Sequence, residues 1–320
     1  MAQLSFFPEP TDEADVLPET ALTRCKKGDL WTLGQHRLLV GDCTVVANVA
    51  RLMDGEQASL LFCDPPYGLH LDTWDVSIID APAWLSKVIP YLTTQGFFVL
   101  CHQFPLALQW MNALEASELR CKDHVVWVKR MATTAALPLN RAHESLFVYG
   151  TQKSRYIETK GRYTDVKLPG VLVDTMSLEG IDRYIKSLEA KVYGRKEEKY
   201  DSKVNRHQSY RYMAISSDRS PEIVNFTNVW SFLPANSRKD SAQSTGHPTC
   251  KPLALVERAI GLCTEQDAIV CDPFCGSGTA IIACERVKRR CYACEISPHY
   301  ADIIIARWER LTRQTAVLLE

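Results

Sequence analysis

The sequence of 320 residues lacks features that mark several classes of protein. No apolar run reaches the ~18 residues that a membrane-spanning helix needs, and the acidic N-terminus is unlike a signal peptide, so we expect a cytoplasmic protein with no membrane partner. The formal net charge of −1 gives no general attraction to nucleic acid. Cys291 and Cys294 form a C-x-x-C pair without a suitably placed second pair, so we expect no metal site and reduced thiols.

What the chain does contain is an alternation of strand-like and helix-like segments, typical of an α/β protein with a doubly wound sheet. The expected strands are 31–33, 37–40, 59–63, 96–101, 124–129, 144–149, 268–271 and 290–294. The expected helices are 44–53, 80–92, 105–114, 279–286 and 298–311, and Thr44 is expected to cap the first of them.

Two segments interrupt this rhythm. Residues 1–27 hold Pro8, Pro10, Pro18 and an excess of acidic residues, and we expect a mobile arm. Residues 151–240 show no repeated strand–helix units, and their one clear periodic element is a helix over 178–193. They hold 17 Lys and Arg against 12 Asp and Glu, a local +5, whereas the rest of the chain carries −6. This distribution suits phosphate contacts made by an insertion on a slightly acidic body.

The strand expected at 59–63 leads into Asp64-Pro65-Pro66-Tyr67-Gly68. Two consecutive prolines continue neither a strand nor a helix, so the chain turns outward here. The turn presents a carboxylate and a phenol ring at the C-terminal edge of the sheet, which is where open α/β sheets bind ligands.

Residues 64–67 resemble the D-P-P-Y catalytic motif of the amino-group (N6-adenine or N4-cytosine) DNA methyltransferases. Residues 272–279, Asp-Pro-Phe-Cys-Gly-Ser-Gly-Thr, are similar to the loop with which that family holds S-adenosylmethionine. The catalytic motif precedes the cofactor loop, which is the order of the permuted β group. The resemblance covers about 28–150 and 228–311.

The permutation predicts a single sheet. A dinucleotide-type sheet begins with a strand, a Gly loop, a helix and a second strand that ends in an acidic residue, and here this unit is C-terminal. The strands at 37–40 and 59–63 then continue the same Rossmann-like sheet. We expect a catalytic half at 28–150, an inserted target-recognition region at 151–240 and a cofactor-binding half at 241–320.

The resemblance also implies site residues. The catalytic residues it implies are Asp64, Pro65, Pro66 and Tyr67. The cofactor-binding residues it implies are Asp42, His247, Thr249, Lys251, Asp272, Phe274, Cys275, Gly276, Ser277, Gly278, Thr279 and Glu295. Gly276 and Gly278 have no Cβ to obstruct a ligand that approaches the backbone, and Glu295 suits the ribose hydroxyls.

The implied reaction is methylation of a flipped base on its exocyclic amine. The lone pair of that amine is delocalised into the base, so acceptors such as Asp64 and the Pro65 carbonyl favour a nucleophilic nitrogen. Tyr67 is suited to stack on the base once it has left the double helix. Cytosine C5 methylation is disfavoured because the chain has no Pro-Cys dipeptide.

We expect transfer to adenine N6. Enzymes that methylate cytosine N4 more often have Ser in place of Asp64, and RNA or protein amide methylases more often have Asn. The alternatives are therefore cytosine N4, an RNA or protein amide, or a catalytically silent DNA-binding relative. Expected partners are double-stranded DNA, a second copy of the chain and a cognate restriction enzyme.

Overall fold

The computed structural model describes residues 23–68, 78–103, 107–128, 143–157, 229–232 and 250–319. The chain divides into two compact units: residues 10–158 with 232–320, and residues 1–9 with 159–231. The elements described below belong to the first unit, except for the short strand β7 (Val229–Ser231). The helix predicted at 178–193, the first 22 residues of the predicted arm and most of the predicted insertion lie outside the described residues.

Within the larger unit the strands follow the order β10-β1-β2-β9-β8-β3-β4-β6-β5. Their bounds are Leu30–Leu33 (β1), His36–Val40 (β2), Ala58–Cys63 (β3), Leu92–His102 (β4), Arg120–Val128 (β5), His143–Gly150 (β6), Ile269–Asp272 (β8), Arg290–Glu295 (β9) and Val317–Leu318 (β10). The pairs β2–β9, β9–β8, β8–β3 and β3–β4 are parallel, whereas β6 is antiparallel to both β4 and β5.

The central order β2-β9-β8-β3-β4 joins the two ends of the chain in one sheet, as the permutation predicted. Val40 at the end of β2 is in register with Glu295 at the end of β9. Cys271 of β8 is in register with Leu61 of β3. Because these strands are parallel, the segments that follow them meet at one edge, and this edge holds the site.

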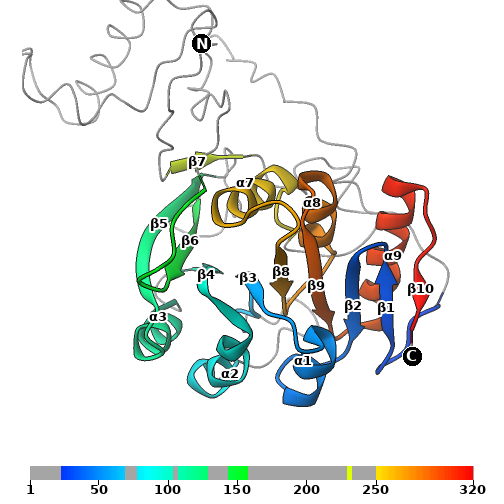
Figure 1. The fold of residues 1–320 in the computed structure, drawn as a ribbon, viewed down its shortest axis with the longest axis horizontal. Coiled ribbons are helices and arrows are strands. Elements are labelled where there is room, and N and C mark those ends of the chain that lie inside the picture. Colours follow the sequence, from blue (N-terminus) through cyan, green and yellow to red (C-terminus); the bar gives the residue numbers. More distant parts are fainter. Residues whose placement is uncertain are drawn as a thin grey trace, which may run out of the picture. The chain divides into compact units, whose positions relative to one another are not determined.

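Helices cover both faces of the sheet. Their bounds are Val46–Met53 (α1), Ala81–Val88 (α2), Ala107–Ala116 (α3), Leu253–Cys263 (α7), Thr279–Val287 (α8) and Pro298–Thr312 (α9), and a 3-10 turn follows α2 at Ile89–Tyr91. Figure 1 shows α1, α2 and α3 on one side of the strands and α7, α8 and α9 on the other. This is the doubly wound α/β fold that the sequence predicted.

A large hydrophobic cluster lies beneath α1, α2 and α3. The indoles of Trp84 and Trp110 are almost completely buried there and meet edge to face, with ring centres 5.5 Å apart. Burial of large aromatic side chains is a major source of stability in α/β cores. This packing fixes α2 behind the site, to which Trp84 also contributes.

Two local expectations were wrong. Thr44 does not cap α1: the cap position is Val45, and the backbone N–H of Thr44 instead donates to the Asp42 carboxylate at 2.8 Å. The expected helices also omit one that the structure contains, α7 at Leu253–Cys263. The apolar residues of α7 are buried between the sheet and α8, and its N-terminus has no side-chain cap that would mark it in the sequence.

Candidate active site

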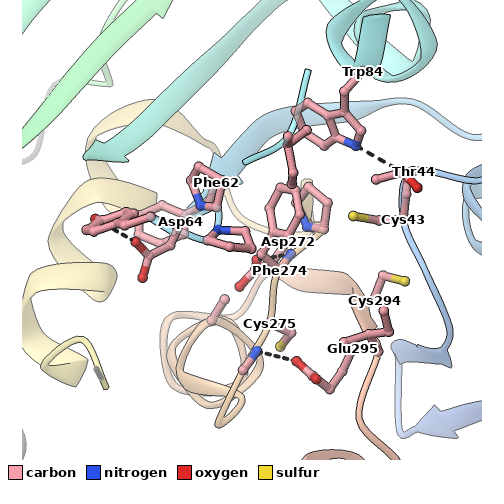
Figure 2. A pocket seen from close by; sticks show the side chains of 18 of the residues that line it. Cys43, Thr44, Phe62, Asp64, Trp84, Asp272, Phe274, Cys275, Cys294 and Glu295 are labelled. Atoms are coloured by element: carbon pink, nitrogen blue, oxygen red, sulfur yellow. Dashed lines mark hydrogen bonds between the residues drawn. The ribbon is translucent and has the colours of Figure 1, made fainter. Parts of the chain in front are cut away.

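A cavity of about 440 Å³ lies at the C-terminal edge of the parallel strands. Figure 2 shows Asp64 at one end, Cys43 and Glu295 at the other, and Asp272 and Phe274 between them. The predicted residues that line it are Asp42, Asp64, Pro65, Pro66, Tyr67, Lys251, Asp272, Phe274, Cys275, Gly276, Ser277, Thr279 and Glu295. His247 and Thr249 lie outside the described residues, and Gly278 is not part of the lining.

The Asp64 carboxylate receives a donor on each oxygen. The Tyr67 hydroxyl donates to Oδ1 at 3.0 Å, and the Lys251 ammonium donates to Oδ2 at 2.6 Å. Tyr67 directly follows Pro65-Pro66, and Lys251 directly precedes Pro252, so prolines restrict the backbone beside both partners. Asp64 is therefore held in one orientation before any substrate enters.

Lys251 also faces a second carboxylate, Glu144 Oε2, at 3.6 Å. Burial alone would lower the pKa of Lys251, but the carboxylates of Asp64 and Glu144 outweigh it and raise that pKa above its usual value. Burial raises the pKa of Asp64, an effect that the Lys251 ammonium opposes. The direct ammonium contact favours an ionised Asp64 and a charged Lys251 at neutral pH.

The Tyr67 ring is supported from behind. His102, at the end of β4, stacks on it with ring centres 4.5 Å apart and an angle of 11° between the planes. Burial is the main cause that lowers the pKa of His102, to about 4, so this imidazole is neutral at pH 7. His102 therefore supports the Tyr67 ring without adding charge to the site.

The cofactor loop is tied to the end of β9 through Glu295. One carboxylate oxygen accepts from the backbone N–H of Gly276 at 2.7 Å, and the other accepts from Ser297 at 2.8 Å. Burial raises the pKa of Glu295 to about 7, against the lowering effect of these backbone N–H groups. Because each oxygen has a second lone pair, the carboxylate retains acceptor capacity toward the cavity.

The sequence suggested that position 278 is glycine because a Cβ would obstruct the ligand, but the structure gives a different reason. Its φ of +84° lies in the left-handed region, and a Cβ on it would lie 2.8 Å from the Ile304 side chain of α9 rather than in ligand space. Glycine is required here because the turn into α8 is left-handed and because α9 packs against it. A direct part of Gly278 in cofactor binding stays a prediction.

The far end of the cavity is apolar and aromatic. Phe274 meets the Trp84 indole with ring centres 5.2 Å apart, and the indole N–H donates to the Cys43 carbonyl at 3.2 Å (Figure 2). The side chain of Asp42 lies beside them, where it accepts from the backbone of Thr44. This end offers stacking surface together with a carboxylate, the combination that an adenine ring with an amino group requires.

The lining residues that were not predicted include three with polar or aromatic side chains that shape the site. Trp84 enters from α2, Lys87 reaches the Thr44 carbonyl at 3.0 Å, and Glu144 enters at the start of β6. None belongs to the motifs, although helical spacing did place Trp84 and Lys87 on one helix. No signal in a single sequence separates Glu144 from a surface carboxylate, since its position depends on the register of β6.

The cavity fits S-adenosylmethionine, the cofactor that the resemblance implies. Its volume lies in the range of small-molecule sites. The carboxylates of Asp42 and Glu295 stand at adjacent strand ends, Phe274 and Trp84 supply flat apolar surface, and the loop at Gly276 presents backbone to the same space.

In the described ranges, no cluster of His, Cys, Asp and Glu is arranged to hold a metal ion. None of the described helices is long and apolar enough to cross a membrane.

The structure resembles solved DNA methyltransferases in fold. The cytosine-N4-specific PvuII DNA methyltransferase superposes with a TM-score of 0.52 at 14% identity, covering 88% of this chain and 91% of that one. The M1.HpyAVI–SAM complex superposes with a TM-score of 0.50 at 18% identity, covering 84% and 98%.

Comparison with known sequences also finds DNA methyltransferases. The Type II methyltransferase M.ScaI of Streptomyces caespitosus is 35% identical over 92 residues, which are 28% of this chain and 30% of that protein. The matches to the first three curated relatives span only 30%, 21% and 28% of their lengths. A family model described as DNA methylase, of the N6/N4 type, matches residues 58–306, which include both motifs and most of the sheet. The chain belongs to this N6/N4 DNA methylase family.

Proposed function

We propose that this protein transfers the methyl group of S-adenosylmethionine to the N6 amine of adenine in double-stranded DNA. The observation that carries the proposal is the preorganised Asp64 carboxylate, which shares one cavity with the glycine-rich loop and with Glu295. Acceptor and cofactor loop must face the same space for direct transfer to an amine, and here both line one cavity (Figure 2).

S-Adenosylmethionine supplies an electrophilic methyl group on a sulfonium. The residues that would hold it are Asp42, Phe274 and Glu295 at the aromatic end, with Gly276 and Ser277 along the loop. The first N–H groups of α8, before the bond from Ile282 to the Gly278 carbonyl, precede the helical hydrogen-bond ladder and suit the methionine carboxylate.

Asp64 acts on the target amine. Its carboxylate accepts an N–H bond and, together with the Pro65 carbonyl, favours a pyramidal nitrogen whose lone pair is available. As the nitrogen gains the N–C bond, the bond between sulfur and the methyl carbon would break and S-adenosylhomocysteine would leave as a neutral thioether. The nitrogen would then release one proton to water, so the site must tolerate a transient positive charge on the nitrogen. The ionised carboxylates of Asp64 and Glu144 provide the matching negative charge. Tyr67, braced by His102, offers its ring to the flipped base.

The presence of Asp64, rather than Ser, at the start of the catalytic motif favours adenine over cytosine as the target base. In this family Ser more often stands at that position in enzymes specific for cytosine N4. Cytosine N4 is the second candidate, because it presents the same kind of exocyclic amine and the PvuII methyltransferase, named as cytosine-N4-specific, has the same fold.

The DNA sequence is proposed to be read by residues 151–240. They carry the local charge of +5, and they separate the catalytic and cofactor halves along the chain. Phosphate contacts from Lys and Arg would position the DNA, and a few polar side chains would read base edges. The segment's first residues anchor it to the core: the Ser154 hydroxyl donates to the Gly96 carbonyl at 2.7 Å, and the Ile157 N–H donates to the Leu262 carbonyl at 2.9 Å.

Expression in a host without DNA methylation, followed by single-molecule sequencing of its genome, tests the function. N6-methyladenine at one short recurrent sequence is the expected result, and it would also define the recognition site. N4-methylcytosine would select the second candidate. An unmodified genome, from cells that contain folded protein, would refute a DNA methyltransferase. The same assay identifies the target of a cognate restriction enzyme.

Exchange of residues 151–240 tests the proposed recognition role. A hybrid that carries the corresponding segment of a relative with another recognition sequence should methylate the relative's site. A control hybrid with its own segment reinserted through the same junctions should keep the original site. If the exchanged hybrid stays active on the original site, recognition lies in the core.

A further inference from the structure

Three charged side chains from distant parts of the chain meet at one end of the cavity. Asp64 follows β3, Lys251 precedes α7, and Glu144 stands at the start of β6. The register places the neighbouring residue, Ser145, opposite His102 at the end of β4, so Glu144 lies at the strand edge where the site is built. All three side chains are largely buried, with 21%, 8% and 10% of their surfaces exposed.

The ammonium lies between the two carboxylates but is closer to one. It is 2.6 Å from Asp64 Oδ2 and 3.6 Å from Glu144 Oε2. In this arrangement Asp64 already binds two donors, Lys251 and the Tyr67 hydroxyl. A carboxylate has about four lone-pair sites, so room for a third donor remains. The contact with the ammonium nevertheless weakens Asp64 as an acceptor for a neutral amine, because it neutralises the charge that attracts the N–H group.

The space beside Tyr67 is also occupied. The Lys251 ammonium lies 5.7 Å from the centre of the Tyr67 ring, on whose face a flipped base is expected to stack. A base that reaches both Tyr67 and Asp64 must therefore enter beside the ammonium. Displacement of Lys251 toward solvent would leave a buried cation unpaired, which is costly.

We propose that Glu144 is the second anchor of Lys251, and that the ammonium moves from Asp64 to Glu144 when the target amine enters. This inference rests on the proposed function. A movement of about 1 Å is small for the flexible four-carbon stem of lysine. The movement keeps the ammonium paired throughout and leaves Asp64 free to accept the amine N–H. Glu144 is thus a positioning residue for the reaction, acting through Lys251.

The other groups that face this cluster carry little charge. They are Tyr67, Cys101, His102 and Asp272. Burial raises the pKa of Tyr67 and of Cys101, lowers that of His102 to about 4 and raises that of Asp272 to about 8. Two carboxylates and one ammonium therefore set the charge near neutral pH, a net −1 that matches the positive charge developing on the amine.

The test uses the full chain, unmethylated bacterial genomic DNA and S-adenosylmethionine with a tritiated methyl group. Single-turnover rates are measured from pH 5.5 to 9.5 for the wild type, Glu144→Gln, Lys251→Met and the double variant. Isothermal titration calorimetry gives the cofactor affinity, and thermal unfolding verifies that each variant is folded. Glu115→Gln, which removes an exposed carboxylate at the end of α3, is the matched control.

Glu144→Gln should slow transfer by about tenfold, with cofactor affinity changed less than about threefold, because the ammonium then has only Asp64 to bind. Lys251→Met leaves two carboxylates facing each other, so the acid limb of its rate profile should move up by about one pH unit or more. The double variant removes this repulsion, so its acid limb should return toward the wild type and its rate at pH 7 should exceed that of Lys251→Met.

A wild-type rate and pH profile in Glu144→Gln would overturn the proposal. So would a double variant in which the two losses simply multiply, since independent sites give additive free energies. A wild type that transfers no methyl group to DNA would refute the proposed function itself, which is a separate outcome. We expect slower transfer by Glu144→Gln and a restored pH profile in the double variant. A merely structural role of Glu144 would not produce this combination.

Discussion

Asp64→Asn tests the acceptor role most closely, because asparagine keeps the shape of the side chain and removes its charge. In the wild type Tyr67 and Lys251 hold the two carboxylate oxygens. The amide of asparagine has one acceptor oxygen, which the Lys251 ammonium is expected to take because the amide N–H₂ group repels a cation. The target amine then faces an amide donor where it requires an acceptor.

The rate loss follows from this geometry. Removal of one preorganised electrostatic partner of a transition state costs about 10²–10³ in rate. We expect that loss in the single-turnover rate of Asp64→Asn. Breaking a fully buried ion pair costs about 3–5 kcal/mol, but Glu144 remains 3.6 Å from Lys251 and Asp64 is 21% exposed. The free energy of unfolding should therefore fall by only about 1–2 kcal/mol.

The assay separates chemistry from binding. Transfer of tritiated methyl groups to DNA is measured with enzyme in excess, and calorimetry measures the affinity for S-adenosylmethionine. That affinity should change less than about threefold, because Glu295 lies at the opposite end of the cavity from Asp64 (Figure 2). A rate within tenfold of the wild type would refute the acceptor role of Asp64. A rate loss accompanied by a comparable loss of cofactor affinity would show that Asp64 acts on the cofactor instead.

Three further predictions concern the loop, pH and the thiols. Gly278→Val should lower the melting temperature, because the residue has a left-handed backbone and its new Cβ would clash with Ile304. The folded fraction should still bind S-adenosylmethionine. An unchanged melting temperature would contradict the contact between position 278 and Ile304. Burial raises the pKa of Glu295 to about 7, so the folded state holds a proton that the unfolded state releases above about pH 4.5. The free energy of unfolding should thus fall as pH rises from 5 to 7, and more steeply in the wild type than in Glu295→Gln; equal slopes in urea denaturation would contradict this. Of the twelve cysteines, Cys121 alone is exposed, so a disulfide reagent should label one thiol of the native protein. Cys121→Ser should abolish that labelling. Rapid labelling of several thiols would contradict the burial of the other cysteines.

The order of the sheet was predictable from sequence because short motifs mark strand ends. Asp64 and Glu295 each end an apolar run, and a permuted α/β topology brings such ends to one edge. The single sheet and the meeting of the two motifs at one edge followed from this rule. The strand β10 and the helix α7 were not predicted, and the cap of α1 was assigned to the wrong residue. The strand β10 has only two residues, too few for a sequence pattern. The helix α7 has no side-chain cap to mark its start.

The charge network was not predictable. The resemblance implied that Lys251 binds the cofactor, and this stays a prediction. Nothing in the sequence indicated that Lys251 also donates to Asp64, or that Glu144 joins them through the antiparallel register of β6. Such contacts depend on three segments that are far apart in the chain. Local patterns fix the type of each element, but only tertiary packing decides which side chains share a cavity.

Analysis of the modified nucleoside tests the central claim most directly. Purified wild type and Asp64→Asn are incubated with S-adenosylmethionine and unmethylated bacterial genomic DNA, the DNA is digested to nucleosides, and mass spectrometry with chromatographic standards identifies the product. The account predicts N6-methyldeoxyadenosine with the wild type and at least about a hundredfold less with Asp64→Asn. N4-methyldeoxycytidine, or equal yields from the two proteins, would contradict it.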